Sequence, residues 1–287
     1  MPGLRALTFA SGRIAFPAMS VNPAIFPTAL LAGLTFWAGL AAGRRAGSRR
    51  ARGWLLALGA LLALPGALLD VHYLHVLDRA AWYYSLRAVP WIEVSAGLAG
   101  FLGGVIWRLP ASVRGRRLRF AGPLCLAVMT LALLVPYAKQ LLTPLAWPDA
   151  PAGWRDGICR QSTPATCGPA SAATLSKSLG VVADERELAR ESFTTSTGTE
   201  CWYLARALRR RGLRVEFLVV DPRTGAIPCP AIAGEGAGGA GHFVALLERL
   251  PAGYVVADPL GGRMVVPEER LRRFGTLTGF FMTLSLR

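Results

Sequence analysis

Four long apolar runs fill the first half of this 287-residue chain and limit its fold more than any other feature. They cover residues 26–43, 54–70, 89–107 and 120–138. A helix needs about 17 to 25 residues to cross the hydrocarbon of a bilayer, and each run approaches that length. Overall, 53% of the residues are hydrophobic and 17% charged, which is too apolar for two soluble domains. The sequence therefore predicts a multi-pass membrane region of four transmembrane helices over residues 1–143.

The segments between the runs indicate the orientation of this region. The first and third are rich in arginine, whereas the second carries only Arg79 and Arg87. The clustered arginines are Arg44, Arg45, Arg49, Arg50 and Arg52 in the first segment and Arg108, Arg114, Arg116, Arg117 and Arg119 in the third. Because arginine-rich loops stay in the cytoplasm, we expect the C-terminal half on the outer side of a bacterial-type inner membrane.

The net charge of +15 also bears on the partners of the chain. Residues 1–150 hold fifteen Lys and Arg against four Asp and Glu, so most of the excess belongs to the apolar half. Each arginine cluster directly adjoins an apolar run, as at a membrane surface. The pattern predicts a lipid bilayer as partner and no nucleic acid.

A second domain is expected over residues 157–287, after a Pro- and Ala-rich linker at 144–156. Its first part has helical spacing, in three stretches at 167–180, 184–192 and 199–212. Strand-like runs follow, with one short helical stretch among them: strands at 214–220, 229–233, 242–249, 253–259, 263–266 and 278–286, and the helix at 267–274. Helices followed by strands predict an α+β domain with helices packed on an antiparallel sheet.

Cys167 lies at the start of the first expected helix, in the stretch "QSTPATCGPA". A helix N-terminus beside a histidine is a common way to make a thiol nucleophilic. His242 is the one histidine of the second domain, at the start of an expected strand. The next expected strand ends at Asp258, so a hairpin sets a carboxylate near this imidazole and can orient it. Gln161 offers a side-chain amide to a developing oxyanion.

Each of these residues alone also has a purely structural interpretation, and their joint order carries the argument. With the stretches "TECWYLARALRRRGL", "GHFVALLE" and "YVVADPLGGRMVVPEERL", the second half resembles the bacteriocin-processing, double-glycine leader peptidases of papain-like fold. The resemblance implies that Cys167 is the nucleophile, His242 the base, Asp258 its orienting group and Gln161 the oxyanion residue. It also implies a peptide or protein substrate, and neither a cofactor nor a catalytic metal.

One departure from the family pattern qualifies what the resemblance implies, and two alternative functions stay open. Many members of that family are fused to an ABC transporter, but this sequence has no GxxxxGK[ST] phosphate loop, so a transporter partner is unknown and a stand-alone, membrane-anchored peptidase is expected. The alternative is a catalytically idle module that binds peptides for a transporter or sensor. A third possibility is acyl transfer to an amine or thiol in place of hydrolysis.

The other polar candidates lie outside this set. Cys159 and Cys201 are predicted to form a disulfide, which an oxidising exterior favours. His72 and His75 form "HYLH" between the second and third runs, where an aromatic-rich loop at the membrane surface is preferred to a metal site. Glu93 is expected near the outer end of the third span.

Overall fold

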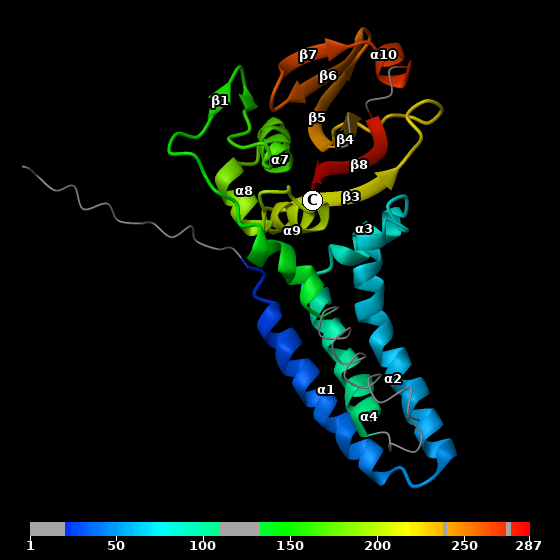
Figure 1. The fold of residues 1–287 in the computed structure, drawn as a ribbon. Coiled ribbons are helices and arrows are strands. Elements are labelled where there is room, and N and C mark those ends of the chain that lie inside the picture. Colours follow the sequence, from blue (N-terminus) through cyan, green and yellow to red (C-terminus); the bar gives the residue numbers. More distant parts are fainter. Residues whose placement is uncertain (1–20, 109–132, 238–239, 274–276) are drawn as a thin grey trace, which may run out of the picture.

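The computed structural model describes residues 21–108, 133–237, 240–273 and 277–287. Long helices form a stalk, and an α+β domain lies at one end of it (Figure 1). We use "stalk" for the helices within residues 25–108 together with the helical stretch 133–142. The α+β domain takes up the chain from β1 onward.

The first two helices of the stalk are long and apolar enough to cross a membrane. They are α1 (Ile25–Arg45) and α2 (Arg49–Asp70), which lie over the first two predicted spans. The Ser48 hydroxyl accepts a hydrogen bond from the Ala51 N–H at 3.1 Å and so caps α2. A short 3-10 turn, η1 (Val71–Leu74), continues α2 toward the α+β domain.

The third predicted span, 89–107, is not a straight helix. Helix α3 (Ala81–Arg87) meets the helical segment Ile92–Arg108 at 87°, and this segment consists of the 3-10 helix η2 (Ile92–Ala99) and α4 (Gly100–Arg108). The bend lies at Pro90 and at Trp91, whose φ is +65°. Proline disfavours helical geometry in the residue before it, which explains the break. The bent pair counts as a third crossing if it forms one span.

The fourth predicted span, 120–138, lies mostly outside the described residues. Its last part belongs to the helix over residues 133–142.

Close backbone contact holds α1 against α4. A Cβ on Gly100 would lie 2.1 Å from the Ala32 carbonyl oxygen, and one on Gly104 would lie 2.0 Å from that of Phe36. Only glycine fits at these two positions. Small residues serve the same purpose at helix contacts in membranes, where apolar burial gives no driving force.

The predicted α+β arrangement with an antiparallel sheet is confirmed. Its helices are α7 (Cys167–Ser178), α8 (Glu185–Glu191), α9 (Cys201–Arg210) and the short α10 (Glu268–Arg273). The six-stranded sheet runs β3-β8-β4-β5-β6-β7, with every neighbouring pair antiparallel. The strands are β3 (Leu213–Val219), β4 (Ala231–Ala237), β5 (Ala240–Leu250), β6 (Gly253–Asp258), β7 (Gly262–Val266) and β8 (Leu277–Leu286).

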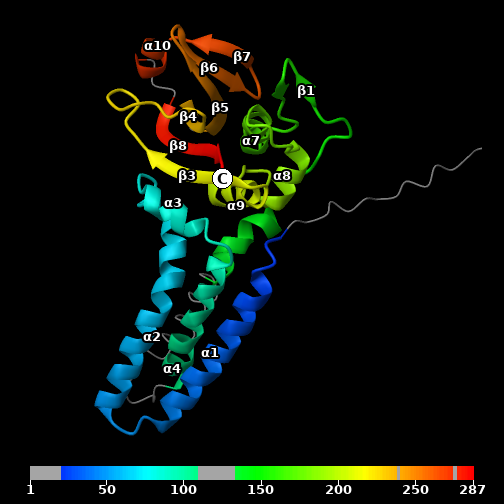
Figure 2. The same ribbon diagram turned by 180° about the vertical axis from the view of Figure 1, so that it is seen from behind.

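The core of the α+β domain includes residues of the stalk. Tyr84 and Ala88 join the main hydrophobic cluster between the helices and the sheet. The Tyr84 ring lies 5.8 Å from the ring of Phe217 and 4.9 Å from that of Phe280. Helix α3 lies at the domain end of the stalk, next to β3, in both views (Figure 2). The segment expected as a loop at the membrane surface is therefore partly a piece of the domain core, although Trp82 remains 57% exposed.

A buried ion pair joins the stalk to α9. Both Arg206 terminal nitrogens bond the Glu93 carboxylate, at 3.1 and 2.8 Å. Glu93 is fully buried and Arg206 is 8% exposed. Glu93 was expected near the outer end of the third span; in the structure it lies at the domain end of the stalk, where it is buried against protein.

Further polar contacts cross the same junction. The Glu200 carboxylate accepts a hydrogen bond from Lys139 Nζ at 2.7 Å and lies 3.7 Å from His72 Nε2. Asn22 donates to the Tyr203 hydroxyl at 3.3 Å. The domain is docked on the stalk through several independent interactions.

The segment predicted as a linker, 144–156, packs on the α+β domain. Pro144 forms a bridge with Thr195, and the Arg186 guanidinium lies over the Trp147 ring at 5.3 Å. Its end forms β1 (Trp154–Arg155), which pairs with β2 (Ile158–Cys159). The segment is therefore in contact with the domain that was expected to begin at residue 157. Pro and Ala content could not reveal these contacts, because they depend on distant side chains.

Replacing Arg206 by alanine should destabilise this junction strongly, because it leaves the Glu93 carboxylate buried without a cation. Breaking one partner of such a pair costs about 3 to 5 kcal/mol. Thermal unfolding in detergent is the measurement, and R210A on the same helix is the control because Arg210 is exposed and pairs with Glu191. Equal melting temperatures for the two variants would contradict the interpretation, and the double variant R206M/E93L should recover much of the loss.

Candidate active site

Cys167 is the first residue of α7. The N–H groups in this first turn have no acceptor within the helix. The Thr166 carbonyl accepts the first intrahelical bond from the Ala170 N–H at 3.0 Å. Pro169 lies within the first turn, where its missing N–H has no cost. The Cys167 side chain is therefore held beside the positive end of the helix dipole.

His242 and Asp258 meet across two neighbouring strands. His242 is the third residue of β5, and Asp258 is the last residue of β6. His242 Nε2 lies 2.9 Å from Asp258 Oδ1, which also accepts the Leu260 N–H at 2.8 Å. A Cβ on Gly261 would lie 2.7 Å from Asp258 Oδ2, so glycine is needed beside the carboxylate.

Helix α7 is tied to β5 next to the imidazole. The Ser171 hydroxyl donates to the Phe243 carbonyl at 2.9 Å, and Ser171 is fully buried. Residue 171 is one helical turn after Cys167, and residue 243 follows His242. Sequence reasoning missed this anchor, for which the only signal is a serine four positions after the cysteine.

The His242 imidazole interacts with both a carboxylate and a thiol. Hydrogen bonds to Asp258 and then to Cys167 raise the pKa of His242 to about 10, against the opposing effect of burial. Because Nε2 bonds the carboxylate, Nδ1 is the nitrogen left to face the sulfur. In the Ser-His-Asp template the two nitrogens have the opposite roles.

The Asp258 carboxylate is stabilised as an anion. Burial alone raises the pKa of Asp258, but hydrogen bonds from His242 and from the Leu260 and Gly261 amides outweigh it, and the pKa lies below its usual value. The carboxylate thus stays charged at neutral pH and favours the imidazolium.

Gln161 lies beside these residues, in the segment that follows β2. Its backbone N–H donates to the Pro259 carbonyl at 3.3 Å, which brings it next to Asp258. Its side-chain Nε2 donates to the Thr163 carbonyl at 2.9 Å. An amide nitrogen has two hydrogens, so one remains for a second acceptor. The structure therefore brings the four predicted residues to one region, between α7 and the ends of β5 and β6.

Comparison with known proteins agrees with this arrangement. The profile of the peptidase C39 family matches residues 155–279. An uncharacterised protein of Methanothermobacter thermautotrophicus is 32% identical over 122 residues, which cover 42% of this chain and 82% of that protein. The chain belongs to the peptidase C39 family. A second relative, from Methanothermobacter marburgensis, is 33% identical over 121 residues, which are 40% of this chain and 77% of the relative.

Solved structures similar to the C39 domain include two peptidase domains of transporters. The peptidase domain of Streptococcus ComA, a bifunctional ABC transporter involved in quorum sensing, is 19% identical, with a TM-score of 0.40 over 45% of this chain and 98% of that one. A double glycine motif protease from an AMS/PCAT transporter, in complex with the leader peptide, is 20% identical. Its TM-score is 0.40, and the match covers 45% of this chain and 91% of that one.

The disulfide predicted between Cys159 and Cys201 is not formed, and both are buried free thiols of the C39 domain. Burial raises the pKa of Cys159 to about 12 and raises that of Cys201 well above its usual value. Cys159 belongs to β2, whereas Cys201 begins α9, and spacing along the sequence could not show how far apart these elements fold. Cys201 starts a helix as Cys167 does, but its pKa is also raised by Glu200.

The two histidines of the stalk, His72 and His75, do not belong to the group of Cys167, His242, Asp258 and Gln161. Among the described residues, no group of three or more His, Cys, Asp or Glu is arranged to hold a metal ion. His72 and His75 are instead near Asp78, with His75 Nδ1 at 2.8 Å from its carboxylate.

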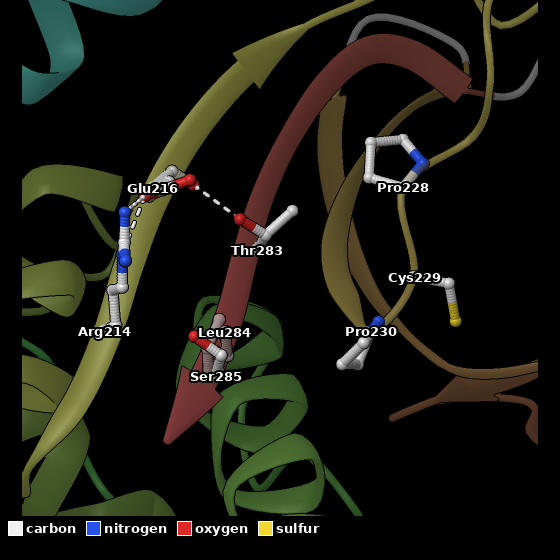
Figure 3. Close-up of a pocket in the computed structure, with 8 residues that line it drawn as sticks. All are labelled: Arg214, Glu216, Pro228, Cys229, Pro230, Thr283, Leu284 and Ser285. Atoms are coloured by element: carbon white, nitrogen blue, oxygen red, sulfur yellow. Dashed lines mark hydrogen bonds and ion pairs between the residues drawn. The ribbon is translucent and has the colours of Figure 1, made fainter. Parts of the chain in front are cut away.

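A pocket on β3, β8 and the turn before β4 contains none of the four predicted residues (Figure 3). It is lined by Arg214, Glu216, Pro228, Cys229, Pro230, Thr283, Leu284 and Ser285. Burial raises the pKa of the Cys229 thiol to about 11. This thiol has no histidine partner among the described residues, so we assign it no chemistry.

The raised pKa of His242 gives a prediction that can be measured without any substrate. The imidazolium should persist through neutral pH and lose its proton only near pH 10, because Asp258 and Cys167 favour the charged form. In D258N the negative charge of the residue 258 side chain is lost, and the pKa of His242 should fall by about one to three units. Hydrogen exchange at the imidazole C2 position, followed by mass spectrometry, reports this titration, with the exposed His75 as internal control. A His242 that titrates near pH 6.5 in both proteins would contradict the arrangement.

Proposed function

We propose that this chain is a membrane-anchored cysteine peptidase whose catalytic group is Cys167, His242 and Asp258. The proposal rests on one observation. The His242 imidazole interacts both with the Asp258 carboxylate and with the Cys167 thiol. A nucleophile, a base and an orienting group thus come from α7, β5 and β6. Membership of the C39 family supports the same activity.

The geometry suggests how the reaction proceeds. His242 already holds the thiol proton as an imidazolium, so the Cys167 thiolate attacks a peptide carbonyl carbon, and the carbonyl oxygen becomes an oxyanion. The Gln161 amide and the Cys167 N–H donate to this oxygen. The imidazolium then gives its proton to the leaving amine, the C–N bond breaks, and a thioester remains on Cys167. Water, deprotonated by His242, hydrolyses the thioester and restores the thiol.

We infer that the substrate is a peptide or protein segment presented in extended form. A related structure is that of a double glycine motif protease in complex with a leader peptide. By that likeness, peptides with a Gly-Gly pair before the scissile bond are the first substrates to test. Processing or maturation of secreted peptides is the role that such a substrate would imply.

We further propose that the stalk crosses the cytoplasmic membrane and that the C39 domain is outside. The arginines at the end of α1 and the start of α2 lie at the end of the stalk away from this domain (Figure 1). A Cβ on Gly43 would lie 3.0 Å from Cβ of Arg108, so the end of α4 lies at the same level. Arginine clustered at one end of a helical bundle favours the cytoplasmic side.

The catalytic proposal predicts that C167A and H242A cleave at least about a thousandfold more slowly than the parent, since each removes a member of the catalytic unit. The probe is an internally quenched peptide with a Gly-Gly pair, and casein is the second substrate. C229A is the matched control, because that thiol lies in a different pocket. Cleavage by C167A at the parent rate would contradict the mechanism, and a parent that cleaves neither probe would favour the idle peptide-binding module.

Sidedness is tested by fusions after Arg287. Alkaline phosphatase there should be active, because it folds only outside the cytoplasm, and a fluorescent protein that matures only in the cytoplasm should stay dark. The opposite pair of results would put the C39 domain in the cytoplasm and reverse the proposed orientation.

A further inference from the structure

We propose that Glu185 is a positioning residue for Gln161, and that it holds the oxyanion donor at a fixed place relative to Cys167. This inference rests on the proposed function, because it assigns a role to a residue behind the Gln161 amide. Glu185 is the first residue of α8 and does not belong to the four residues selected from the sequence.

The carboxylate of Glu185 bonds the residue that follows Gln161 in two places. Its Oε1 accepts the Ser162 N–H at 2.7 Å, and its Oε2 accepts the Ser162 hydroxyl at 2.6 Å. The peptide unit before Gln161 is held separately, by the bond from its N–H to the Pro259 carbonyl. Both peptide units that flank Gln161 are thus fixed, one by the Asp258–Pro259 segment and one by Glu185.

The burial of Glu185 requires an explanation. The residue is 4% exposed, and among the described residues it forms no ion pair. Desolvating a carboxylate is costly unless hydrogen bonds compensate, and here Ser162 supplies both side-chain hydrogen bonds. Glu185 is not needed to cap α8, because the Asp184 side chain accepts the Arg186 and Glu187 N–H groups at 2.8 and 3.1 Å.

The location of α8 explains why this contact matters for catalysis. Helix α8 packs against α7, which begins with Cys167. Glu185 therefore connects the segment of Gln161 to the same pair of helices that carries the nucleophile. An error of about 1 Å in a positioning contact can cost a hundredfold in rate, so the link affects the reaction without touching the substrate.

The test compares two reagents that react with the same sulfur. With p-nitrophenyl acetate the sulfur bonds the carbonyl carbon, an oxyanion forms, and the C–O bond then breaks to release p-nitrophenolate and leave an acetyl thioester. With iodoacetamide the sulfur displaces iodide from a CH₂ carbon and no oxyanion forms. Both rates are measured for Cys167 on the full-length protein in detergent, by mass spectrometry of the peptide that contains it.

We expect E185A to slow acetylation of Cys167 about tenfold and to leave its alkylation rate within about twofold, because the displaced amide affects only the oxyanion. Q161A should slow acetylation about a hundredfold. Both changes act through the same Gln161 amide. In the Q161A background, E185A should therefore slow the acetylation of Cys167 by less than a further factor of about two. E185Q should remain within about threefold of the parent, because its amide can accept from the Ser162 N–H and donate to the Ser162 hydroxyl.

E187A is the matched control, since Glu187 is on the same helix but its side chain is 62% exposed. Acetylation of E185A at the rate of E187A, with Q161A slow, would overturn the role of Glu185 alone. Loss of both reactions in E185A, or full additivity with Q161A, would also overturn it and indicate a general structural role. A Q161A protein that is acetylated like the parent would contradict the oxyanion assignment in the proposed function and the Glu185 inference with it.

Discussion

The hydrogen bond between His242 and Asp258 is the interaction on which the proposed chemistry depends. It fixes Nε2 of the imidazole, leaves Nδ1 toward Cys167, and favours the charged ring. The bond exists because β5 and β6 are antiparallel neighbours, and because Gly261 leaves room around the carboxylate. The sheet therefore fixes the position of the His242 imidazole. Helix α7, which is bonded to β5 through Ser171, places the Cys167 thiol beside it.

Helix α9 gives the molecule its second organising constraint. Its buried side chains belong to the core of the C39 domain, and Arg206 reaches from it to Glu93 of the stalk. Tyr84 contributes in the other direction, from the stalk into the domain core. The two parts thus share a core and a buried charge pair. A domain held in this way has a defined orientation on its helices, unlike one on a flexible tether.

Local patterns in the sequence were sufficient to predict much of this structure. The helix beginning at Cys167, the alternation of buried and exposed residues in β3, and the order of helices and strands depend on neighbours in the chain. Cys167 begins α7 and Asp258 ends β6, and His242 lies close to the start of β5, so these three residues could be named from local patterns. Gln161 lies in the segment after β2 and was named from its place before the cysteine. The meeting of His242 and Asp258 follows from the antiparallel hairpin that joins β5 to β6.

Contacts between distant residues could not be predicted in the same way. Nothing in the sequence near Glu93 or Tyr84 indicates a partner more than a hundred residues away. The expected disulfide failed for the same reason, since Cys159 and Cys201 could be paired only by assuming where β2 and α9 lie. The role of Glu185 was hidden because an acidic residue in the first turn of a helix is ordinarily explained by the helix dipole.

The most direct test of the central claim is the alkylation of Cys167 relative to Cys229 within one sample, in the parent and in H242A. If the imidazole activates the sulfur, Cys167 reacts faster than Cys229 in the parent, and this preference is lost in H242A while Cys229 is unchanged. If the ratio of the two rates is the same in both proteins, His242 does not act on Cys167, and the account of this site is wrong.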